Sequence, residues 1–181
     1  GAGIVSRSSE RFCQPGFDLL LPAATPLPDG LDLLSTEAAE ALRIRNGVPM
    51  WGRELTPDTL PAEAGLDASA IDFHKGCYIG QEVISRIKSV GRVNRKLARL
   101  RAVGEIPPGE ELCPGMRLID GETQVGTLTS VAGSEALGFV KRDHDQPGTR
   151  LSLAPAAAGD ADNDQKKILS TSLEIVESRQ A

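Results

Sequence analysis

The sequence predicts an α+β fold in which a small antiparallel β-barrel follows a region of mixed strand, helix and loop. Three observations lead to this prediction: two short apolar runs near the start, one helical repeat in residues 32–45, and a series of short apolar runs separated by turns beyond residue 93. Short strands at regular spacing, with Pro-Gly and Asp-Gly turns between them, are typical of small barrels and sandwiches. We therefore expect two domains, residues 1–92 and residues 93–181.

The first domain is expected to begin with a β-hairpin and to continue into one amphipathic helix. Apolar runs at 3–7 and 16–21 flank a polar stretch that ends in Pro-Gly, as two neighbouring strands do. The helix is predicted over 32–45, where apolar residues recur at helical spacing before a Gly-Val-Pro stop. Residues 50–70 contain prolines and little periodicity, so we expect an ordered loop with one helical turn at most.

A second short helix is predicted from Gln81 to a stop at Gly91, and the strands of the barrel follow it. The predicted strands cover residues 96–103, 116–119, 124–130, 136–141, 149–153 and 168–176. Residues 154–165 are mainly alanine, glycine, aspartate and asparagine, with little apolar surface to bury. They are expected to form a flexible insertion in the last hairpin.

The composition excludes several classes of protein. With 40% apolar and 25% charged residues it is typical of a globular protein, and its net charge of −5 argues against general nucleic-acid binding. No apolar run approaches the roughly 18 residues of a membrane helix, and the start has no signal-peptide pattern. Three cysteines without a Cys-x-x-Cys pair disfavour a disulfide framework and a structural zinc site. We therefore expect a cytoplasmic protein with no metal site, no membrane anchor and no nucleic-acid partner.

Chemically active side chains are concentrated in residues 71–82, which read Ile-Asp-Phe-His-Lys-Gly-Cys-Tyr-Ile-Gly-Gln-Glu. The glycines permit left-handed backbone conformations and close backbone approach. Cys77 lies just before a predicted helix and near Lys75 and His74, and both features favour the thiolate, which attacks electrophiles or binds metals. The alternative is a buried structural cysteine in a tight turn, and the residues alone favour the two readings to a similar degree.

The string Lys75-Gly76-Cys77-Tyr78-Ile79-Gly80-Gln81-Glu82 resembles the K-G-C-Y-x-G-Q-E signature of the YgfZ family. That family is related to the aminomethyltransferase (T-protein) of the glycine cleavage system. Residues 43–55 are similar to the superfamily segment R-L-E-A-G-[IM]-P-x-x-G-x-[ED]-L, with Arg-Asn in place of its Glu-Ala. Residues 15–18 resemble the strand entry G-x-x-G-[FY]-E, with Asp18 in place of its glutamate, and residues 109–153 resemble the C-terminal barrel.

This resemblance implies part of a ferredoxin-like folate-binding domain followed by a T-protein-like barrel, in a chain that lacks the N-terminal portion of the family. It also implies binding of tetrahydrofolate and a role in the assembly or repair of iron–sulfur proteins, which would be its partners. Cys77 would be the functional thiol, Lys75 a charge that stabilises its thiolate, and Tyr78 a stacking or channel-lining group. Asp18 would contact pterin nitrogens and Arg43 a folate carboxylate.

Two other functions stay open at this point, so whether the protein is an enzyme is not decided. One is a folate-dependent aminomethyltransferase-like enzyme, a branch that lacks the Lys-Gly-Cys-Tyr cysteine. The other is an inert module that binds a partner and uses Cys77 structurally. A run of basic residues is also expected to attract a polyglutamyl folate or an acidic protein. The run consists of Lys75, Arg86, Lys88, Arg92, Arg95, Lys96, Arg99 and Arg101.

Overall fold

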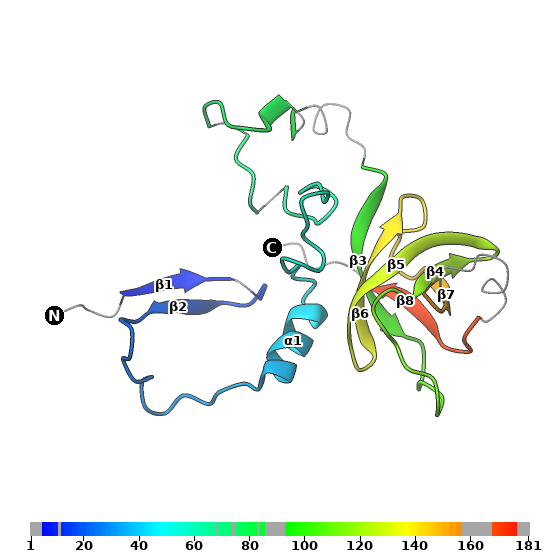
Figure 1. The fold of residues 1–181 in the computed structure, drawn as a ribbon, viewed down its shortest axis with the longest axis horizontal. Helices are drawn as coiled ribbons and strands as arrows, with labels where there is room; N and C mark the ends of the chain where they lie inside the picture. Colours follow the sequence, from blue (N-terminus) through cyan, green and yellow to red (C-terminus); the bar gives the residue numbers. More distant parts are fainter. Residues whose placement is uncertain are drawn as a thin grey trace.

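The computed structural model describes residues 5–10, 12–67, 69–73, 75–82, 84–85, 93–156 and 168–176. Within these residues the named elements are eight strands and one ten-residue helix (Figure 1). The described fold is therefore mostly β, with less helix than an α+β fold usually has. The ferredoxin-like arrangement stays a prediction, because the described residues before the barrel contain one two-stranded sheet and one named helix.

The predicted hairpin is present. Strand β1 (Val5–Ser9) pairs antiparallel with β2 (Gly16–Leu20), with Val5 opposite Leu20 and Arg7 opposite Asp18. Most residues of both strands are exposed, and among the described residues no further strand joins this sheet. Figure 1 shows the hairpin standing apart from the barrel, with the helix between them.

Helix α1 (Thr36–Arg45) is shorter than predicted at its start, because Ser35 caps it. The Ser35 hydroxyl accepts a hydrogen bond from the Ala38 N–H at 3.1 Å, which satisfies one of the free donors of the first turn. Leu33 and Leu34 consequently precede the helix and are 75% and 64% exposed. The apolar spacing there was misleading, since these leucines do not belong to a buried helix face.

The end of α1 needs a glycine. Gly47 has a φ of +75° and donates its N–H to the Ile44 carbonyl at 3.0 Å. The Val48 N–H then reaches back to the Arg43 carbonyl at 3.0 Å, which completes a Schellman motif. A Cβ on Gly47 would also lie 2.9 Å from the Arg99 Cδ atom. The Gly-Val-Pro stop predicted from the sequence is therefore confirmed.

The described residues between 46 and 80 form turns and loops, as expected for 50–70, with an isolated bridge between Trp51 and Leu55. The Leu97 N–H donates to the Glu63 carbonyl at 2.7 Å, which attaches this region to the first barrel strand. Gln81, Glu82, Ile84 and Ser85 are helical, which agrees with the predicted helix start. The remainder of that predicted helix lies outside the described residues.

The second half of the chain forms the predicted small barrel. Its strands are β3 (Arg95–Ala102), β4 (Arg117–Asp120), β5 (Thr123–Ala132), β6 (Glu135–Lys141), β7 (Arg150–Ala154) and β8 (Ser172–Val176). They pair antiparallel in the order β3-β6-β5-β4-β7-β8, and pairing of β8 with β3 closes the barrel. The last strand starts at Ser172, later than predicted, and most of the predicted insertion at 154–165 lies outside the described residues.

Aliphatic side chains fill the barrel, and two glycines let its strands approach closely. The core includes Leu100, Leu118, Leu128, Val140, Leu151, Leu153 and Leu173. A Cβ on Gly138 of β6 would lie 2.7 Å from the Thr127 carbonyl oxygen of β5. A Cβ on Gly126 would lie within 2.3 Å of the Phe139 carbonyl oxygen. Both contacts are too short for any side chain, so the β5–β6 contact depends on glycine.

Candidate functional site

The Lys75–Glu82 motif forms an exposed turn that leads into a helix. The Gln81 N–H donates to the Tyr78 carbonyl at 3.2 Å, and the Ile84 N–H donates to the Gly80 carbonyl at 3.2 Å. Gly80 adopts a φ of +87°, a conformation that side chains other than glycine rarely tolerate. The turn leaves Cys77 exposed, as a free thiol. A buried structural cysteine, the alternative left open by the sequence, is therefore excluded for Cys77 in this structure.

Lys75 and Tyr78 contact each other within this turn. The Lys75 Nζ lies 4.7 Å from the centroid of the Tyr78 ring, a cation–π distance. The Tyr78 hydroxyl is buried and has no hydrogen-bond partner among the described residues. The ring therefore packs against the lysine ammonium, while the buried hydroxyl is left without a hydrogen bond to the described residues. A direct effect of Lys75 on the Cys77 thiolate stays a prediction, and His74 lies outside the described residues.

Arg43 lies at the centre of a buried polar network between helix α1 and the barrel. Its Nε and Nη2 atoms bind both carboxylate oxygens of Glu40, at 2.8 and 2.7 Å. Nη1 donates to Glu54 at 3.0 Å and to the Val48 carbonyl at 2.7 Å, and Nη2 donates to Ser130 of β5 at 2.7 Å. All five N–H donors of the guanidinium are thus used by the protein itself. A folate carboxylate would have to displace one of these partners.

Glu54 is the second carboxylate that binds Arg43 in this network. It is fully buried, and it accepts hydrogen bonds from the Met50 N–H at 3.0 Å and from the Ser130 hydroxyl at 2.6 Å. A buried carboxylate is tolerated only when it is paired and hydrogen-bonded, as here. Ser130 lies 87 positions from Arg43, and no motif in the sequence pointed to it. Glu54 stands within the superfamily-like segment, but its role as the buried partner of Arg43 was not anticipated.

The electrostatics of this network favour the charged forms of Arg43 and Glu40. Burial alone would lower the pKa of Arg43, but the hydrogen bond to Glu40 and the charges of Glu54 and Glu40 outweigh burial and raise it. The hydrogen bond from Arg43 is the main cause that lowers the pKa of Glu40, with the charges of Arg43 and Arg53 adding to it. The network is therefore a set of ion pairs and hydrogen bonds that is suited to holding α1 against β5.

Asp18 lies on β2 of the exposed hairpin. Its carboxylate pairs with the guanidinium of Arg7 on β1, with 3.1 Å between Oδ2 and Nη2. The side chain of Asp18 is 21% exposed and that of Arg7 is 71% exposed. The pair crosses one face of the hairpin, so the carboxylate is held in a fixed direction. Asp18 and the motif turn stand on separate elements of the described chain.

The described arginines of the predicted basic run are paired with carboxylates or buried. Arg95 pairs with Glu63 at 3.1 Å and lies over the Phe139 ring, and Arg101 pairs with Glu135 at 2.8 Å. Arg99 is buried against the turn at Gly47. Arg86, Lys88 and Arg92 lie outside the described residues. The expected attraction of an anionic ligand by this run therefore lacks support from the described arginines.

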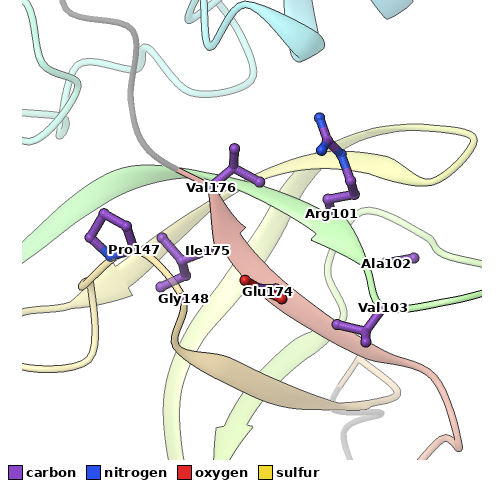
Figure 2. A pocket seen from close by; sticks show the side chains of 8 residues that line it. All are labelled: Arg101, Ala102, Val103, Pro147, Gly148, Glu174, Ile175 and Val176. Carbon is purple, nitrogen blue, oxygen red and sulfur yellow. The ribbon is translucent and has the colours of Figure 1, made fainter.

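A shallow pocket of about 300 Å³ opens on the barrel between β3 and β8 (Figure 2). Its charged residues already have partners, since Arg101 pairs with Glu135 and Glu174 lies 3.8 Å from Arg150. None of the residues predicted to act in the site lines it. The lining residues are Arg101, Ala102, Val103, Pro147, Gly148, Glu174, Ile175 and Val176.

The described residues contain neither a candidate metal cluster nor a membrane-spanning helix. No group of three or more His, Cys, Asp or Glu side chains there is placed to hold a metal ion. No described helix is both long and apolar enough to cross a membrane. All three cysteines are free, and Cys113 is exposed like Cys77, while Cys13 is half-buried.

No family model matches the sequence. The chain is 32% identical over 142 residues to an iron-sulfur cluster assembly factor IBA57 homolog, mitochondrial, of Chaetomium globosum; the alignment covers 77% of this chain and 28% of that protein. It is 28% identical over 142 residues to an aminomethyltransferase of Listeria monocytogenes serotype 4b, covering 75% of this chain and 38% of that protein. The chain thus spans well under half the length of both relatives.

The fold has a solved counterpart. The crystal structure of glycine cleavage system aminomethyltransferase T from Bartonella henselae matches with a TM-score of 0.61 and 21% identity, over 77% of this chain and 37% of that chain. At this identity the match shows a shared fold. Sequence and fold comparisons together support a place for this chain in the superfamily of the glycine-cleavage T-protein.

Proposed function

We propose that this chain is part of a YgfZ-like, tetrahydrofolate-binding protein that supports the assembly or repair of iron–sulfur proteins, with Cys77 as its functional thiol. The observation that carries the proposal is the exposed Cys77 in the Lys-Gly-Cys-Tyr-Ile-Gly-Gln-Glu turn. The similarity to an iron-sulfur cluster assembly factor supports it further. The partners would be iron–sulfur proteins.

The surroundings of Cys77 suit contact with another macromolecule. A Cβ added at Gly76 or at Gly80 would meet nothing within 4 Å, so the space beside the thiol is open. Ile79, two positions on, is fully exposed. An accessible thiol next to a glycine and open space can be reached by a bulky partner, whereas a thiol in a narrow cleft accepts only a small molecule.

The residues present fit tetrahydrofolate in part. Asp18 offers a carboxylate that can accept hydrogen bonds from the amide edge of a pterin, and Tyr78 offers a partly exposed aromatic ring. Arg43 does not fit, because its donors are all used within the protein. We therefore assign the pterin contact to Asp18 and a structural role to Arg43. Bound tetrahydrofolate would supply a carrier of one-carbon groups.

In this proposal residues 1–92 form the second part of a T-protein-like folate-binding domain with a ferredoxin-like core, and residues 93–181 form the C-terminal barrel domain. The attachment of Glu63 to β3 and the Arg43 network with Ser130 are the contacts that would join the two. Because the matched relatives are longer than this chain, the complete folate site would include residues beyond those seen here.

Calorimetric titration of tetrahydrofolate tests the folate proposal. Wild type, Asp18→Asn and Cys77→Ala are compared in the longest natural form of the protein, with Asp120→Asn as a control carboxylate on the barrel, 44% exposed and paired with His144. We expect Asp18→Asn to weaken binding by about tenfold or more, since hydrogen bonds to charged groups contribute roughly 1.5–3 kcal/mol. Cys77→Ala and Asp120→Asn should bind as wild type does. No binding by any form, or equal binding by all forms, would contradict the assignment.

The similarity to an aminomethyltransferase keeps a folate-dependent, transferase-like enzyme as the second candidate. The two candidates differ in their need for the thiol. A transferase of this fold should keep its activity in Cys77→Ala, whereas a thiol-dependent maintenance factor should lose its function. An assay of one-carbon transfer to or from tetrahydrofolate, run on wild type and Cys77→Ala, separates them.

A further inference from the structure

The segment that carries the Cys77 motif leaves the barrel and returns to it at one point. Glu63 and Arg95 are 32 positions apart, yet the Arg95 Nη2 atom lies 3.1 Å from the Glu63 Oε2 atom. The Leu97 N–H donates to the Glu63 carbonyl at 2.7 Å. At the other end, the Arg142 N–H of the barrel donates to the Asn94 carbonyl at 3.0 Å. Both ends of the segment between Glu63 and Arg95 are therefore fixed at the start of β3.

The main-chain contact of Glu63 takes the place of a strand partner. In the described residues, pairing of β8 with β3 starts at Arg99, two residues after Leu97. A strand N–H that has no partner in the sheet needs another acceptor when water is excluded. The Glu63 carbonyl is the acceptor for Leu97. The contact with Glu63 therefore continues the hydrogen bonding of β3 beyond its described pairing with β8.

The carboxylate of Glu63 strengthens this anchor. Its side chain is 10% exposed, and it accepts a hydrogen bond from the Leu60 N–H at 3.4 Å in addition to that from Arg95. The Arg95 guanidinium also lies 4.6 Å from the centroid of the Phe139 ring on β6. Because a largely buried carboxylate depends on its cation, this ion pair contributes more than one on an open surface does.

A series of turns connects the anchor to the motif. The Leu66 N–H donates to the Pro61 carbonyl at 2.9 Å, and the Ala70 N–H donates to the Leu66 carbonyl at 2.9 Å. The motif begins at Lys75, soon after these turns. Figure 1 shows the described part of the motif segment standing away from the barrel, near the top of the view. The position of the motif relative to the barrel is therefore set through this connection.

We propose that Glu63 is a positioning residue for the Cys77 thiol. By joining the base of the segment to β3, Glu63 restricts the positions that the motif turn can take relative to the barrel, since closing a loop removes conformational freedom. The thiol is then presented to an iron–sulfur protein at a defined distance from the barrel, so this inference rests on the proposed role of Cys77. It adds to the functional site a residue that lies outside the motif.

Two spin labels measure the position of the thiol. Cys77 and Cys113 are both exposed, and close to Cys113 the Gly115 N–H donates to the Leu128 carbonyl of β5 at 2.8 Å. The labels are attached to these two cysteines in the longest natural form of the protein, with every other cysteine replaced by serine. Pulsed electron paramagnetic resonance then gives the distribution of the distance between them. We expect this distribution to be at least about twofold wider in Glu63→Lys, because two cations then meet at the anchor and open it.

Glu135→Lys is the matched control, since Glu135 pairs with Arg101 of the same strand at 2.8 Å and its side chain is 19% exposed. It should leave the distribution unchanged. Glu63→Lys combined with Arg95→Glu exchanges the two charges, and it should narrow the distribution again. Thermal unfolding checks the fold of each variant; if Glu63→Lys does not fold, Arg95→Gln should widen the distribution in its place.

Three results would overturn the positioning role: an unchanged width when the Glu63–Arg95 pair is broken, equal widening in Glu135→Lys, or no recovery in the charge-exchanged variant. The same variants, supplied to cells that lack the protein, separate this inference from the proposed function. Glu63→Lys should lower the specific activity of an iron–sulfur enzyme, and the charge-exchanged variant should restore it. Full restoration by Cys77→Ser would contradict the role of the thiol, whereas an unchanged width in Glu63→Lys contradicts the positioning role alone.

Discussion

Arg43 shows how one residue acquires a role that its position in the sequence does not reveal. The resemblance implied a folate contact, but the guanidinium is buried and binds Glu40, Glu54 and Ser130. Two of these partners come from a loop and a barrel strand, which only folding brings to the helix. A sequence pattern can therefore identify an arginine of interest without showing whether it faces a ligand or the protein interior.

Replacement of Arg43 by methionine should destabilise the protein strongly, because it leaves Glu54 as a buried charge without its cation. Loss of one partner of a buried pair costs about 3–5 kcal/mol. Arg53→Met is the matched control, since Arg53 also binds Glu40, at 2.9 Å, but is 43% exposed. That change should cost less than about 1 kcal/mol in urea unfolding. Equal losses of unfolding free energy for the two variants would contradict the structural role that we assign to the Arg43 network.

The contact of Glu110 with Ser170 and Thr171 should be sensitive to acid. Hydrogen bonds from the Ser170 and Thr171 side chains, then from their N–H groups, lower the pKa of Glu110 from 4.5 to about 2. Because the folded-state pKa is depressed, this contact stabilises the fold above pH 4.5, and the stabilisation is lost as pH falls towards about 2. Wild type should therefore exceed Glu110→Gln in melting temperature at pH 6, and the difference should shrink between pH 4.5 and 2. A difference that is constant with pH would contradict this assignment.

At the scale of elements, turn residues and apolar alternation predicted the barrel well. Pro-Gly and Asp-Gly turns punctuate the second half, and six expected strands all appear within a few residues of their predicted bounds. The strand order could not be predicted, since it depends on which apolar faces meet across long connections. Helix α1 was predicted four residues too early because Leu33 and Leu34 have helical spacing, whereas the cap at Ser35 decides where the helix begins.

Gly138 should be required for the contact between β5 and β6. Gly138→Ala places a Cβ 2.7 Å from the Thr127 carbonyl oxygen, so the strands must separate, at a cost of about 1–3 kcal/mol. Gly133→Asn in the β5–β6 turn is the control, since its φ of +58° suits asparagine and a Cβ there meets nothing within 4 Å. Chemical denaturation of both variants checks this. A tolerated Gly138→Ala would mean that the two strands have room to move apart.

At the scale of the whole molecule, the two halves differ in how completely they bury their apolar residues. The barrel has a closed sheet and a filled core, whereas residues 16–37 expose seven large apolar side chains. The motif turn could be identified from the sequence because its residues are adjacent; the structure leaves its thiol exposed, and the role of Cys77 stays a prediction. The Arg43 network could not be found in this way, because its members are distant in the sequence.

Limited proteolysis should cleave the exposed segment before helix α1 faster than the closed barrel. Thermolysin cleaves at apolar residues, and residues 27–34 offer exposed leucines outside any helix or strand. We expect the first cuts there, at least about tenfold faster than cuts within β3 or β6, because cleavage in a closed sheet requires unfolding. Mass spectrometry of early fragments identifies the sites. Early cleavage within the barrel strands would contradict the closed barrel.

The most direct test of the central claim uses cells that lack this protein and measures the specific activity of an iron–sulfur enzyme in them. The cells are supplied with wild type, Cys77→Ser or Cys113→Ser at equal protein levels, and both cysteines are exposed in the structure. The account predicts that wild type and Cys113→Ser restore the enzyme activity and that Cys77→Ser does not. Full restoration by Cys77→Ser would contradict the assignment of Cys77 as the functional thiol.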